Sequence, residues 1–463
     1  MLFIAAPPLN AQRESSENVP RKTMTRYTDQ TITQDLLPEY LDINDEFKSA
    51  FDLMEYTKEC LFITGKAGTG KSTLLKYFKV NTGKKIIVLA PTGVAAINVG
   101  GQTIHSFFRL PPKIIRKDTI KLLKDRSLVE NLDMVIIDEA SMVRADIMDG
   151  IDYALRLNRG RMKIPFGGVQ MVFFGDLFQL SPVVENEARQ LLEELYSSPY
   201  FFSAKVFDEC HIRSIELSTI YRQKDSSFME LLNRIRNKEY TENDLDILNE
   251  RVQKDAEAPK QYSTVVLTTT NSLANAINQD RLSKLPGREI VYEAKATGKF
   301  EESSYPTDTS LRLKKGAQVI LIKNDPDKKW VNGTLAKVAA LSKDSVVVDI
   351  NGCACDVPVV KWQKIEYSYN EDEDKIEDEV VGAFAQYPIK LAWAITIHKS
   401  QGQTFDKVII DLGRGAFTHG QLYVALSRCT CLDGIRLKRP VMPSDIIFDE
   451  RIYEFKDRFA SLI

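Results

Sequence analysis

The residues best suited to chemistry lie in the stretch GKAGTGKS, which begins at Gly65. Its spacing matches G-x-x-x-x-G-K-[ST], between an apolar run that predicts a strand and a segment that predicts a helix. Glycines allow backbone N–H groups to wrap a phosphate, and the helix N-terminus adds its dipole. A chance glycine turn is the alternative, and the complete match in this context argues against it. The residues that we expect to bind the nucleotide are Gly65, Ala67, Gly68, Thr69, Gly70, Lys71, Ser72 and Thr73.

Two acidic residues at the end of a second apolar run complete this chemistry. In a loop of this kind Lys71 bridges the β- and γ-phosphates, and the Ser72 hydroxyl ligates Mg²⁺. The segment MVIIDEAS then supplies Asp138 for the Mg²⁺ shell and Glu139 to orient the attacking water. An ordinary acidic strand end is the alternative interpretation. Further on, GDLFQLSPV places Gln179 where a neutral side chain could sense the γ-phosphate.

The identity of the nucleotide follows from motifs that the chain lacks. A guanine-nucleotide switch would carry D-x-x-G after the second strand and N-K-x-D later. The N-K pair that begins at Asn237 reads NKEY and has no Asp at the required place. We therefore predict ATP rather than GTP. A kinase would need an acceptor pocket and a lid, which no segment specifically indicates.

The elements that must position these residues form two α/β units. The apolar runs CLFIT, KIIVLA, DMVIID and VQMVFFG are each followed by turn residues or a polar segment. A later set contains STVVLTTT, KLAWAITI and DKVIIDL, followed by the helix-like GQLYVALSR. Continuous apolar strands separated by helical segments predict parallel sheets that are covered on both faces. The fold class is therefore α/β.

Short runs spaced by Gly, Asn and Asp interrupt the second unit and predict a small antiparallel barrel. Its acidic segment NEDEDKIEDE is expected to be a solvated loop. The predicted boundaries are a flexible polar segment over 1–40, a first unit over 41–212 with an accessory insertion near 103–130, a second unit over 213–298 and 389–440, the inserted barrel over 299–388, and a C-terminal tail over 441–463.

Composition narrows the class of partner. The net charge is only −2, so a polyanion would have to meet a local basic surface. The six cysteines include no C-x-x-C and the chain has four histidines, which disfavours a zinc site and fits reduced thiols in a cytosolic setting. No run approaches the roughly 18 apolar residues of a membrane span, and the first residues lack the basic start of a signal peptide. We therefore expect no membrane partner.

The order of the motifs resembles a known family of motors. The segments are GKAGTGKS, APTGVAA, TIHSFF, IIDEASMV, GDLFQLSPV, LSTIYRQ, LKKGAQVILIKND, WVNGTLAKV, AITIHKSQGQTF and GQLYVALSR. In this order they are similar to superfamily-one helicases of the 5′→3′ class, most of all the Pif-one (petite integration frequency) family, and more distantly RecD-like motors. The resemblance spans about residues 44 to 430. It implies two RecA-like domains with an SH3-like barrel inserted in the second.

The resemblance also implies roles for residues of the second unit. Arg222 in YRQ and Arg428 in ALSR would reach the γ-phosphate as arginine fingers, and Gly402 and Gln403 would link that cleft to DNA. Solvated surface arginines are the alternative. One position departs from the family: Phe47 stands where a Gln that reads the adenine edge is expected. This leaves adenine recognition open, with core packing as the alternative role of Phe47.

Candidate DNA contacts come from several loops. Thr92 and Gly93 follow a strand and could offer hydroxyl and N–H groups to phosphate. Phe107 and Phe108 could stack on bases or fill a core. Further candidates are His105, Thr268, Asn271, His398 and Lys399.

The resulting hypothesis is an ATP- and Mg²⁺-dependent 5′→3′ helicase that acts on single-stranded and forked DNA. The resemblance extends this to G-quadruplexes and RNA–DNA hybrids, and to replication, repair, recombination and telomere maintenance. It also implies a monomer that can pair on DNA. The location would be the nucleoid and cytoplasm in a bacterium, or the nucleus or mitochondrion in a eukaryote, and the compact length favours a bacterial or phage origin. Two alternatives stay open: a RecD-like motor subunit, and a DNA-dependent ATPase switch that remodels partners without unwinding.

Overall fold

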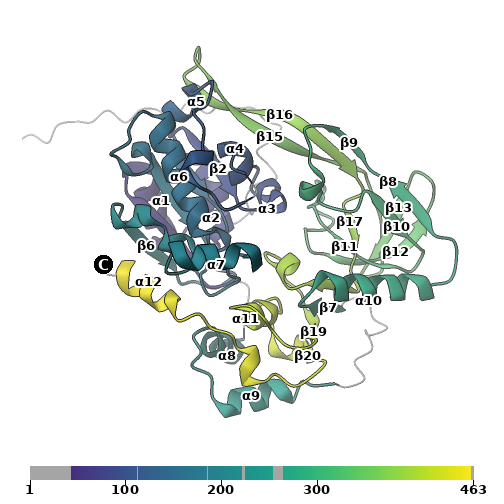
Figure 1. Ribbon diagram of the computed structural model, residues 1–463. Coiled ribbons are helices and arrows are strands. Elements are labelled where there is room, and N and C mark those ends of the chain that lie inside the picture. The colour runs from purple at the N-terminus through teal and green to yellow at the C-terminus, as the bar shows by residue number, and fades with distance from the viewer. Residues whose placement is uncertain (1–42, 112, 185, 222–224, 254–263, 460–463) are drawn as a thin grey trace, which may run out of the picture. The chain divides into compact units, whose positions relative to one another are not determined.

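The computed structural model describes residues 43–111, 113–184, 186–221, 225–253 and 264–459 (Figure 1). The segment predicted to be flexible over 1–40 lies outside these residues. Among the helices described, none is both long and apolar enough to cross a membrane.

A parallel sheet of six strands forms the core of the first α/β unit, in the order β3-β2-β4-β5-β1-β6. Its strands are β1 (Cys60–Gly65), β2 (Ile86–Ala90), β3 (Gln102–Thr103), β4 (Met134–Ile137), β5 (Gln170–Phe174) and β6 (Ile212–Leu217). Its helices are α1 (Asp45–Tyr56), α2 (Lys71–Asn81), α3 (Gly93–Asn98), α4 (Ile104–Phe108), α5 (Ser127–Glu130), α6 (Ala145–Asn158) and α7 (Asn186–Leu195). The predicted accessory segment lies between β3 and β4 and contains α4 and α5.

Helices cover both faces of this sheet, and the alternation of side chains along a strand shows why. On β4, Met134 packs into the cluster that α1 and α2 complete, whereas Val135 packs into the cluster that contains α6 residues. Both side chains are buried, so a central strand has to be apolar at every position. The prediction of a parallel sheet covered on both faces is confirmed.

The second α/β unit has a smaller parallel sheet in the order β18-β7-β19-β20. Its strands are β7 (Thr264–Thr268), β18 (Ala394–Thr396), β19 (Lys407–Asp411) and β20 (Ile435–Leu437), and its helices are α8 (Ser226–Arg236), α9 (Glu242–Asn249), α10 (Asn271–Lys284) and α11 (Gln421–Leu426). Val266 of β7 packs against Ala274 of α10, and its neighbours Val265 and Leu267 join the cluster that contains α8 and α11 residues.

Antiparallel strands form the insertion between β7 and β18 in the chain. The strands are β8 (Ile290–Glu293), β9 (Lys295–Gly298), β10 (Ser310–Leu313), β11 (Gln318–Leu321), β12 (Leu335–Leu341), β13 (Val346–Ile350), β14 (Cys353–Val357), β15 (Val360–Asn370), β16 (Lys375–Gln386) and β17 (Ile389–Leu391). They pair as β14-β13-β12-β11-β17, β10-β8 and β15-β16-β9. The predicted insertion over 299–388 is therefore too short, because β8, β9 and β17 also pair within these sheets.

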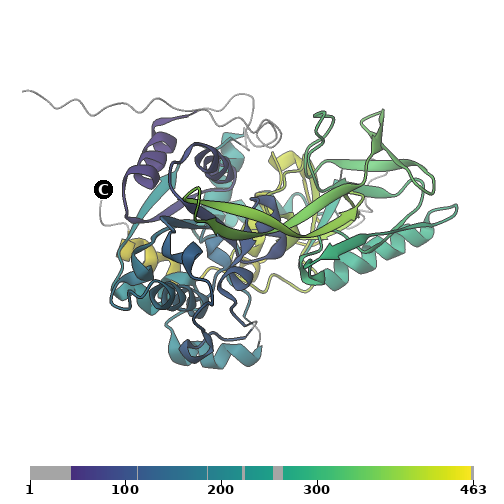
Figure 2. The ribbon, with the colours of Figure 1, turned by 90° about the horizontal axis from the view of Figure 1, so that it is seen from above.

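The long hairpin of β15 and β16 reaches from the insertion to the first unit, near α4 and α5 (Figures 1 and 2). The Tyr367 hydroxyl lies 3.3 Å from the backbone nitrogen of Val88 and 3.4 Å from its carbonyl oxygen. At the hairpin tip, Asp374 forms an ion pair with Lys85. The predicted solvated loop is confirmed for the exposed turn at 371–374, including Asp374, but the rest of the acidic segment from Lys375 belongs to β16.

Two other predicted boundaries move. The boundary at 212/213 falls inside β6, which pairs with β1 along its whole length, so the first unit extends to Leu217. The predicted tail over 441–463 contains α12 (Arg451–Phe459). The ring of Phe455 packs edge-on against Phe62 of β1 at a centroid distance of 5.4 Å. This part of the chain therefore contributes to the core of the first unit.

Candidate active site

The glycine-rich loop joins the end of β1 to the start of α2. Gly70 is the residue that caps α2, with φ 87° and ψ 11°, a left-handed conformation that glycine adopts without strain. A Cβ atom on Gly65 would lie 2.6 Å from the Leu217 carbonyl oxygen and 2.6 Å from Thr69 Oγ1. Both positions therefore require glycine. Because Gly70 provides no side-chain cap, the first N–H groups of α2 remain available to a phosphate.

Lys71 curls back into the loop that precedes it. Its Nζ donates to the carbonyl oxygens of Gly65 at 2.6 Å and Lys66 at 3.0 Å. Thr69 is buried and donates its hydroxyl to Lys66 O at 3.0 Å, which stiffens the turn. Ser72 is exposed in the first turn of α2, and Thr73 follows it half-buried. The loop therefore concentrates a cation, a hydroxyl and backbone donors at one strand end.

The acidic pair lies at the same edge of the sheet. Asp138 and Glu139 follow β4, which is separated from β1 only by β5. Glu139 adopts φ 51° and ψ 42° at the start of a short 3₁₀-helix, Ala140–Met142. A left-handed conformation costs a non-glycine residue roughly 1–2 kcal/mol, and such strain gathers at functional sites.

Burial and charge tune both carboxyl groups. Burial, together with the neighbouring Asp138 charge, raises the pKa of Glu139 to about 7, while Lys71 and Arg428 act in the opposite direction. Burial also raises the pKa of Asp138, against the effects of a backbone hydrogen bond and of Lys71. A carboxyl group with a pKa near neutrality suits a residue that accepts a proton from water.

Asp176 and Gln179 occupy the edge of β5, between the loop and the acidic pair. The Asp176 side chain is fully buried, and its Oδ2 accepts a hydrogen bond from Gln179 Nε2 at 3.1 Å. Burial alone would raise the pKa of Asp176, but the charges of Arg236 and Lys71 lower it. Gln179 is buried as well, so its amide has a defined position beside the nucleotide site.

Arg428 comes from the second unit, just beyond α11, and is 1% exposed. Its Nη1 donates to the carbonyl oxygens of Ser400 and Gln403, each at 3.4 Å, and its Nη2 donates to Ser427 Oγ at 2.9 Å. Its charge also lowers the pKa of Glu139. The structure thus brings Arg428 into contact with the Gly402–Gln403 turn and close enough to Glu139 for its charge to act on that carboxyl group. Arg222, the other predicted finger, lies outside the described residues.

Three predicted DNA contacts are exposed at the ends of strands. Thr92 caps α3 and its Oγ1 accepts from Ala95 N, which leaves the hydroxyl hydrogen free to donate. Asn271 begins α10, and Lys399 lies in the short 3₁₀-helix after β18. Gly93 approaches the insertion closely, since a Cβ there would lie 2.4 Å from Ser304 Oγ.

Other candidates are enclosed. Phe107 and Phe108 lie in the hydrophobic core, so the core interpretation holds and neither ring is presented to bases. Thr268 is fully buried and its hydroxyl donates to Thr270 O at 3.1 Å, which removes it from the phosphate contacts. His105 and His398 are half-buried, and burial lowers the pKa of each ring, so both are neutral near pH 7. Phe47 is a core residue that packs edge-on against Tyr77.

Two residues that contact the site were not predicted from the sequence. Tyr423 of α11 accepts the N–H of Ala67 in the glycine-rich loop at 3.4 Å, and Arg236 of α8 pairs with Asp176. Tyr423 lies inside the GQLYVALSR segment, which was a usable signal. Arg236 has no local signal, because it is one of two arginines at the end of an amphipathic helix.

The donors present fit Mg²⁺ that arrives with a nucleotide. The described residues contain no group of three or more His, Cys, Asp or Glu side chains that could hold a metal by themselves. Ser72 and Asp138 offer a hydroxyl and a carboxylate, which are hard oxygen donors, and Mg²⁺ is usually held by one or two such groups together with phosphates.

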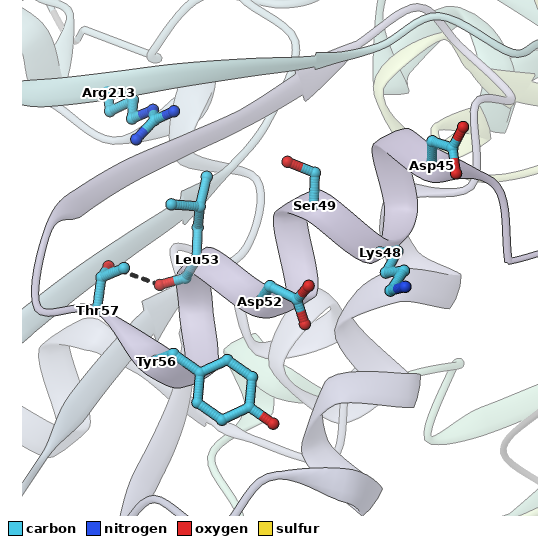
Figure 3. Close-up of a pocket in the computed structure, with 8 residues that line it drawn as sticks. All are labelled: Asp45, Lys48, Ser49, Asp52, Leu53, Tyr56, Thr57 and Arg213. Atoms are coloured by element: carbon cyan, nitrogen blue, oxygen red, sulfur yellow. Dashed lines mark hydrogen bonds between the residues drawn. The ribbon is translucent and has the colours of Figure 1, made fainter. Parts of the chain in front are cut away.

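A surface depression of about 520 Å³ lies elsewhere, along α1 (Figure 3). The residues that line it are Asp45, Lys48, Ser49, Asp52, Leu53, Tyr56, Thr57 and Arg213. They carry charges of both signs and include none of the residues of the glycine-rich loop or the acidic pair. We assign it no chemical role.

Known proteins are similar to this chain in sequence and structure over most of its length. A family model described as PIF1-like helicase matches residues 42–246, and one described as UvrD-like helicase C-terminal domain matches residues 391–430. An ATP-dependent DNA helicase Pif1 of Bdellovibrio bacteriovorus is 32% identical over 91% of this chain and 93% of its own. The ATP-dependent DNA helicase PIF1 of Xenopus laevis is 34% identical over 81% of this chain, which spans 58% of that longer protein. The crystal structure of Bacteroides sp Pif1 in complex with ADP-AlF4 is 38% identical, with a TM-score of 0.84, over 91% of this chain and 98% of that one.

Proposed function

Because the chain belongs to the PIF1-like helicase family and is an ATP-dependent DNA helicase, we propose that it moves 5′→3′ along single-stranded DNA and opens the duplex ahead. The observation that carries the proposed movement is the convergence of two units on one strand edge, whereas the 5′→3′ direction rests on the family resemblance alone. The first unit supplies Lys71 and Glu139, and the second supplies Arg428, whose charge acts on Glu139. A site divided between two units can couple hydrolysis to their relative movement.

Each residue has a role that its surroundings support. Lys71 binds the β- and γ-phosphates, since its ammonium already lies within the loop. Glu139 takes a proton from the attacking water, and Gln179 senses the γ-phosphate. Arg428 stabilises the charge that develops on the transferred phosphoryl group. Arg222 is proposed as a second cation on the strength of its motif alone.

We assign Mg²⁺ to Ser72 and Asp138. When bound, the ion supplies positive charge to the phosphate oxygens. The chain's own contribution is to hold a hydroxyl after β1 and a carboxylate after β4, at the same edge of the sheet, with Lys71 close enough to lower the pKa of Asp138 against burial.

The DNA path follows the exposed donors. Thr92, Asn271 and Lys399 can reach phosphates, and the Gly402–Gln403 turn joins this path to the nucleotide site through Arg428. Gly93, His105 and His398 stay as neighbouring candidates. Such contacts do not read base edges, which suits a motor that passes over any sequence.

Several finer features belong to the same proposal. The inserted antiparallel strands would form an SH3-like barrel, the enzyme would act as a monomer that can pair on DNA, and forks, G-quadruplexes and RNA–DNA hybrids would be substrates. The solved relatives include Bacteroides Pif1 bound to ssDNA and a structure titled for DNA unwinding at forked dsDNA by two coordinating Pif1 helicases. The protein would act in the nucleoid and cytoplasm of a bacterium, or in the nucleus or mitochondrion of a eukaryote.

A strand-displacement assay tests the polarity. Two duplexes of identical sequence carry a single-stranded tail at either the 5′ or the 3′ end, and opening is followed by fluorescence with ATP and Mg²⁺. We expect opening of the 5′-tailed duplex and none of the 3′-tailed one. Equal opening of both duplexes would refute the proposed direction. Hydrolysis without any opening would favour a remodelling ATPase.

A further inference from the structure

A buried ion pair joins the two α/β units beside the nucleotide site. Arg236, the last residue of α8, places Nη2 3.1 Å from Oδ1 of Asp176, which follows β5. Their side chains are 4% and 0% exposed. Removing one partner of such a pair leaves an uncompensated buried charge, so both charges have to be kept or lost together.

The guanidinium of Arg236 is held in one orientation. Its central carbon lies 3.7 Å from the centroid of the Phe178 ring, in a cation–π contact with the residue two positions after Asp176. Its Nε is buried without a hydrogen-bond partner among the described residues. The group is therefore fixed by its stacking on Phe178 and its single carboxylate contact, both in the segment that leads to Gln179.

Asp176 transmits this position to Gln179. One carboxylate oxygen, Oδ1, accepts from Arg236 and from the Phe178 backbone N–H at 3.2 Å. The other, Oδ2, accepts from Gln179 Nε2 at 3.1 Å. Arg236 and Gln179 therefore hold opposite oxygens of a single carboxylate. A displacement of α8 that moves Arg236 must break its bond to Oδ1 or turn the carboxylate, and a turned carboxylate no longer offers Oδ2 to the Gln179 amide in the same place.

The same segment is held by a second set of contacts, from His419 and Gly420 immediately before α11. His419 Nε2 lies 3.0 Å from the Leu177 carbonyl oxygen, and its Nδ1 accepts the Asp449 N–H at 3.0 Å, which leaves the proton on Nε2. A Cβ on Gly420 would lie 2.5 Å from Phe178 O and 2.4 Å from Gln179 O. Because α8 and α11 both belong to the second unit, the 176–179 segment is set in place by the unit opposite its own.

We propose that Arg236 is a positioning residue for ATP hydrolysis, which acts through Asp176 to orient Gln179 while the two α/β units are closed on each other. The inference rests on the proposed nucleotide site. It differs from an arginine finger, because the contact of Arg236 is with a carboxylate of the first unit, Asp176. A purely structural ion pair is the competing account, and it predicts loss of stability without a specific link to Gln179.

A double-mutant cycle separates these accounts. Steady-state ATPase activity is measured with a saturating single-stranded oligonucleotide for R236Q, Q179A and the double variant. We expect each single variant to lower kcat by about 10- to 100-fold, as for a misplaced reacting group, with KM for ATP within about threefold of wild type. The double variant should be no slower than the slower single variant, because both changes remove the same alignment. Multiplied losses in the double variant, or wild-type kcat in a folded R236Q, would overturn the proposal.

Two further variants keep the test interpretable. R234Q changes the neighbouring arginine, which pairs with Asp244 at 2.7 Å, and should leave kcat unchanged. R236K retains the buried charge and replaces R236Q in the same cycle if R236Q does not fold. We expect R236K to lower kcat by about 3- to 10-fold. Combined with Q179A, it should cause no further loss of kcat. K71A tests the nucleotide site itself: loss of ATPase in K71A with full activity in R236Q would reject only the role of Arg236.

Discussion

In both α/β units the carboxyl ends of parallel strands form one edge of the sheet, yet only the first unit has a loop suited to the phosphates of a nucleotide. In the first unit, β1 leads through a glycine-rich loop to α2, whose capping residue Gly70 has no side chain to occupy the helix N–H groups. In the second unit, β7 leads almost directly to α10, and the hydroxyl of Thr270 accepts the N–H of Leu273 at 3.3 Å. Both helices have a dipole. The length and caps of the loop, rather than the helix itself, therefore decide which edge binds a nucleotide.

The strand edge of the second unit has a different role, which is indicated by the residues at that edge. Arg428 contacts the Ser400–Gln403 turn there through two carbonyl oxygens, and its Nη2 donates to the adjacent Ser427 hydroxyl. This edge therefore delivers a cation to the first unit and presents Asn271 and Lys399 at its exposed ends. The phosphate loop and the catalytic base thus belong to the first unit, whereas the second unit supplies a cation and candidate DNA contacts. Substitutions on either side test this division.

The largest expected effect comes from removing the cation. R428A should lower DNA-stimulated kcat by roughly 10³- to 10⁵-fold, because the charge that develops on the phosphoryl oxygens loses its partner. Affinity for a single-stranded oligonucleotide should remain. ATPase rates with and without DNA, together with a melting curve to establish folding, make the measurement. Intact stimulation by DNA would show that Arg428 is not a finger, and R222A tests the other predicted finger in the same assay.

The next effect comes from the base in the first unit. E139Q should lower kcat by about 10²- to 10⁴-fold, since only proton acceptance from water is lost. Binding of a non-hydrolysable ATP analogue, followed by fluorescence titration, should stay close to wild type. A collapse of that affinity would instead make Glu139 a structural residue or a metal ligand.

The pH dependence of kcat/KM provides a second test of Glu139 as the base. The pKa of Glu139 is raised to about 7, and the group must be ionised to accept a proton. We therefore expect kcat/KM for ATP to fall by about tenfold per pH unit below pH 7 and to level off above it. The residual activity of E139Q should lack this acid limb. A wild-type profile that is flat between pH 5.5 and 8 would exclude Glu139 as the titrating base.

The smallest effect concerns the capped edge of the second unit. T270A should destabilise the protein by about 0.5–2 kcal/mol, which is the usual cost of losing an N-cap. Chemical denaturation measures that change, and nucleotide affinity should be unaffected because this helix end lies outside the proposed nucleotide site. A weaker affinity for ATP in T270A would show that the strand edge of the second unit also takes part in nucleotide binding.

How much of this could be predicted from the sequence depends on the range of each contact. The phosphate loop and the Asp138–Glu139 pair were predictable, because short spacings on consecutive strands determine where they lie. The position of β6 was missed because its burial is mixed, with three half-buried positions and one exposed residue, Glu216, between buried ends. The Asp176–Arg236 pair was not predictable, since it joins residues 60 positions apart in the chain and Arg234 nearby looks equivalent.

The aromatic residues illustrate the same limit. Phe107 and Phe108 fit either stacking on bases or core packing by sequence, and the core interpretation follows only from how α4 sits against the sheet. The ion pair of Asp374 at the hairpin tip was equally hidden, because its partner Lys85 lies in another part of the chain. Long-range packing, rather than local propensity, decides such cases.

Whether the glycine-rich loop of the first unit is the nucleotide site is decided by comparing wild type, K71A and T270A in a titration with a fluorescent ATP analogue and in assays of ATPase activity and unwinding. The account predicts one nucleotide per chain in wild type and T270A. For K71A it predicts the same fold by circular dichroism, with ATPase and unwinding reduced by about 10²- to 10³-fold or more. K71A that hydrolyses ATP and unwinds a 5′-tailed duplex at the wild-type rate would contradict it.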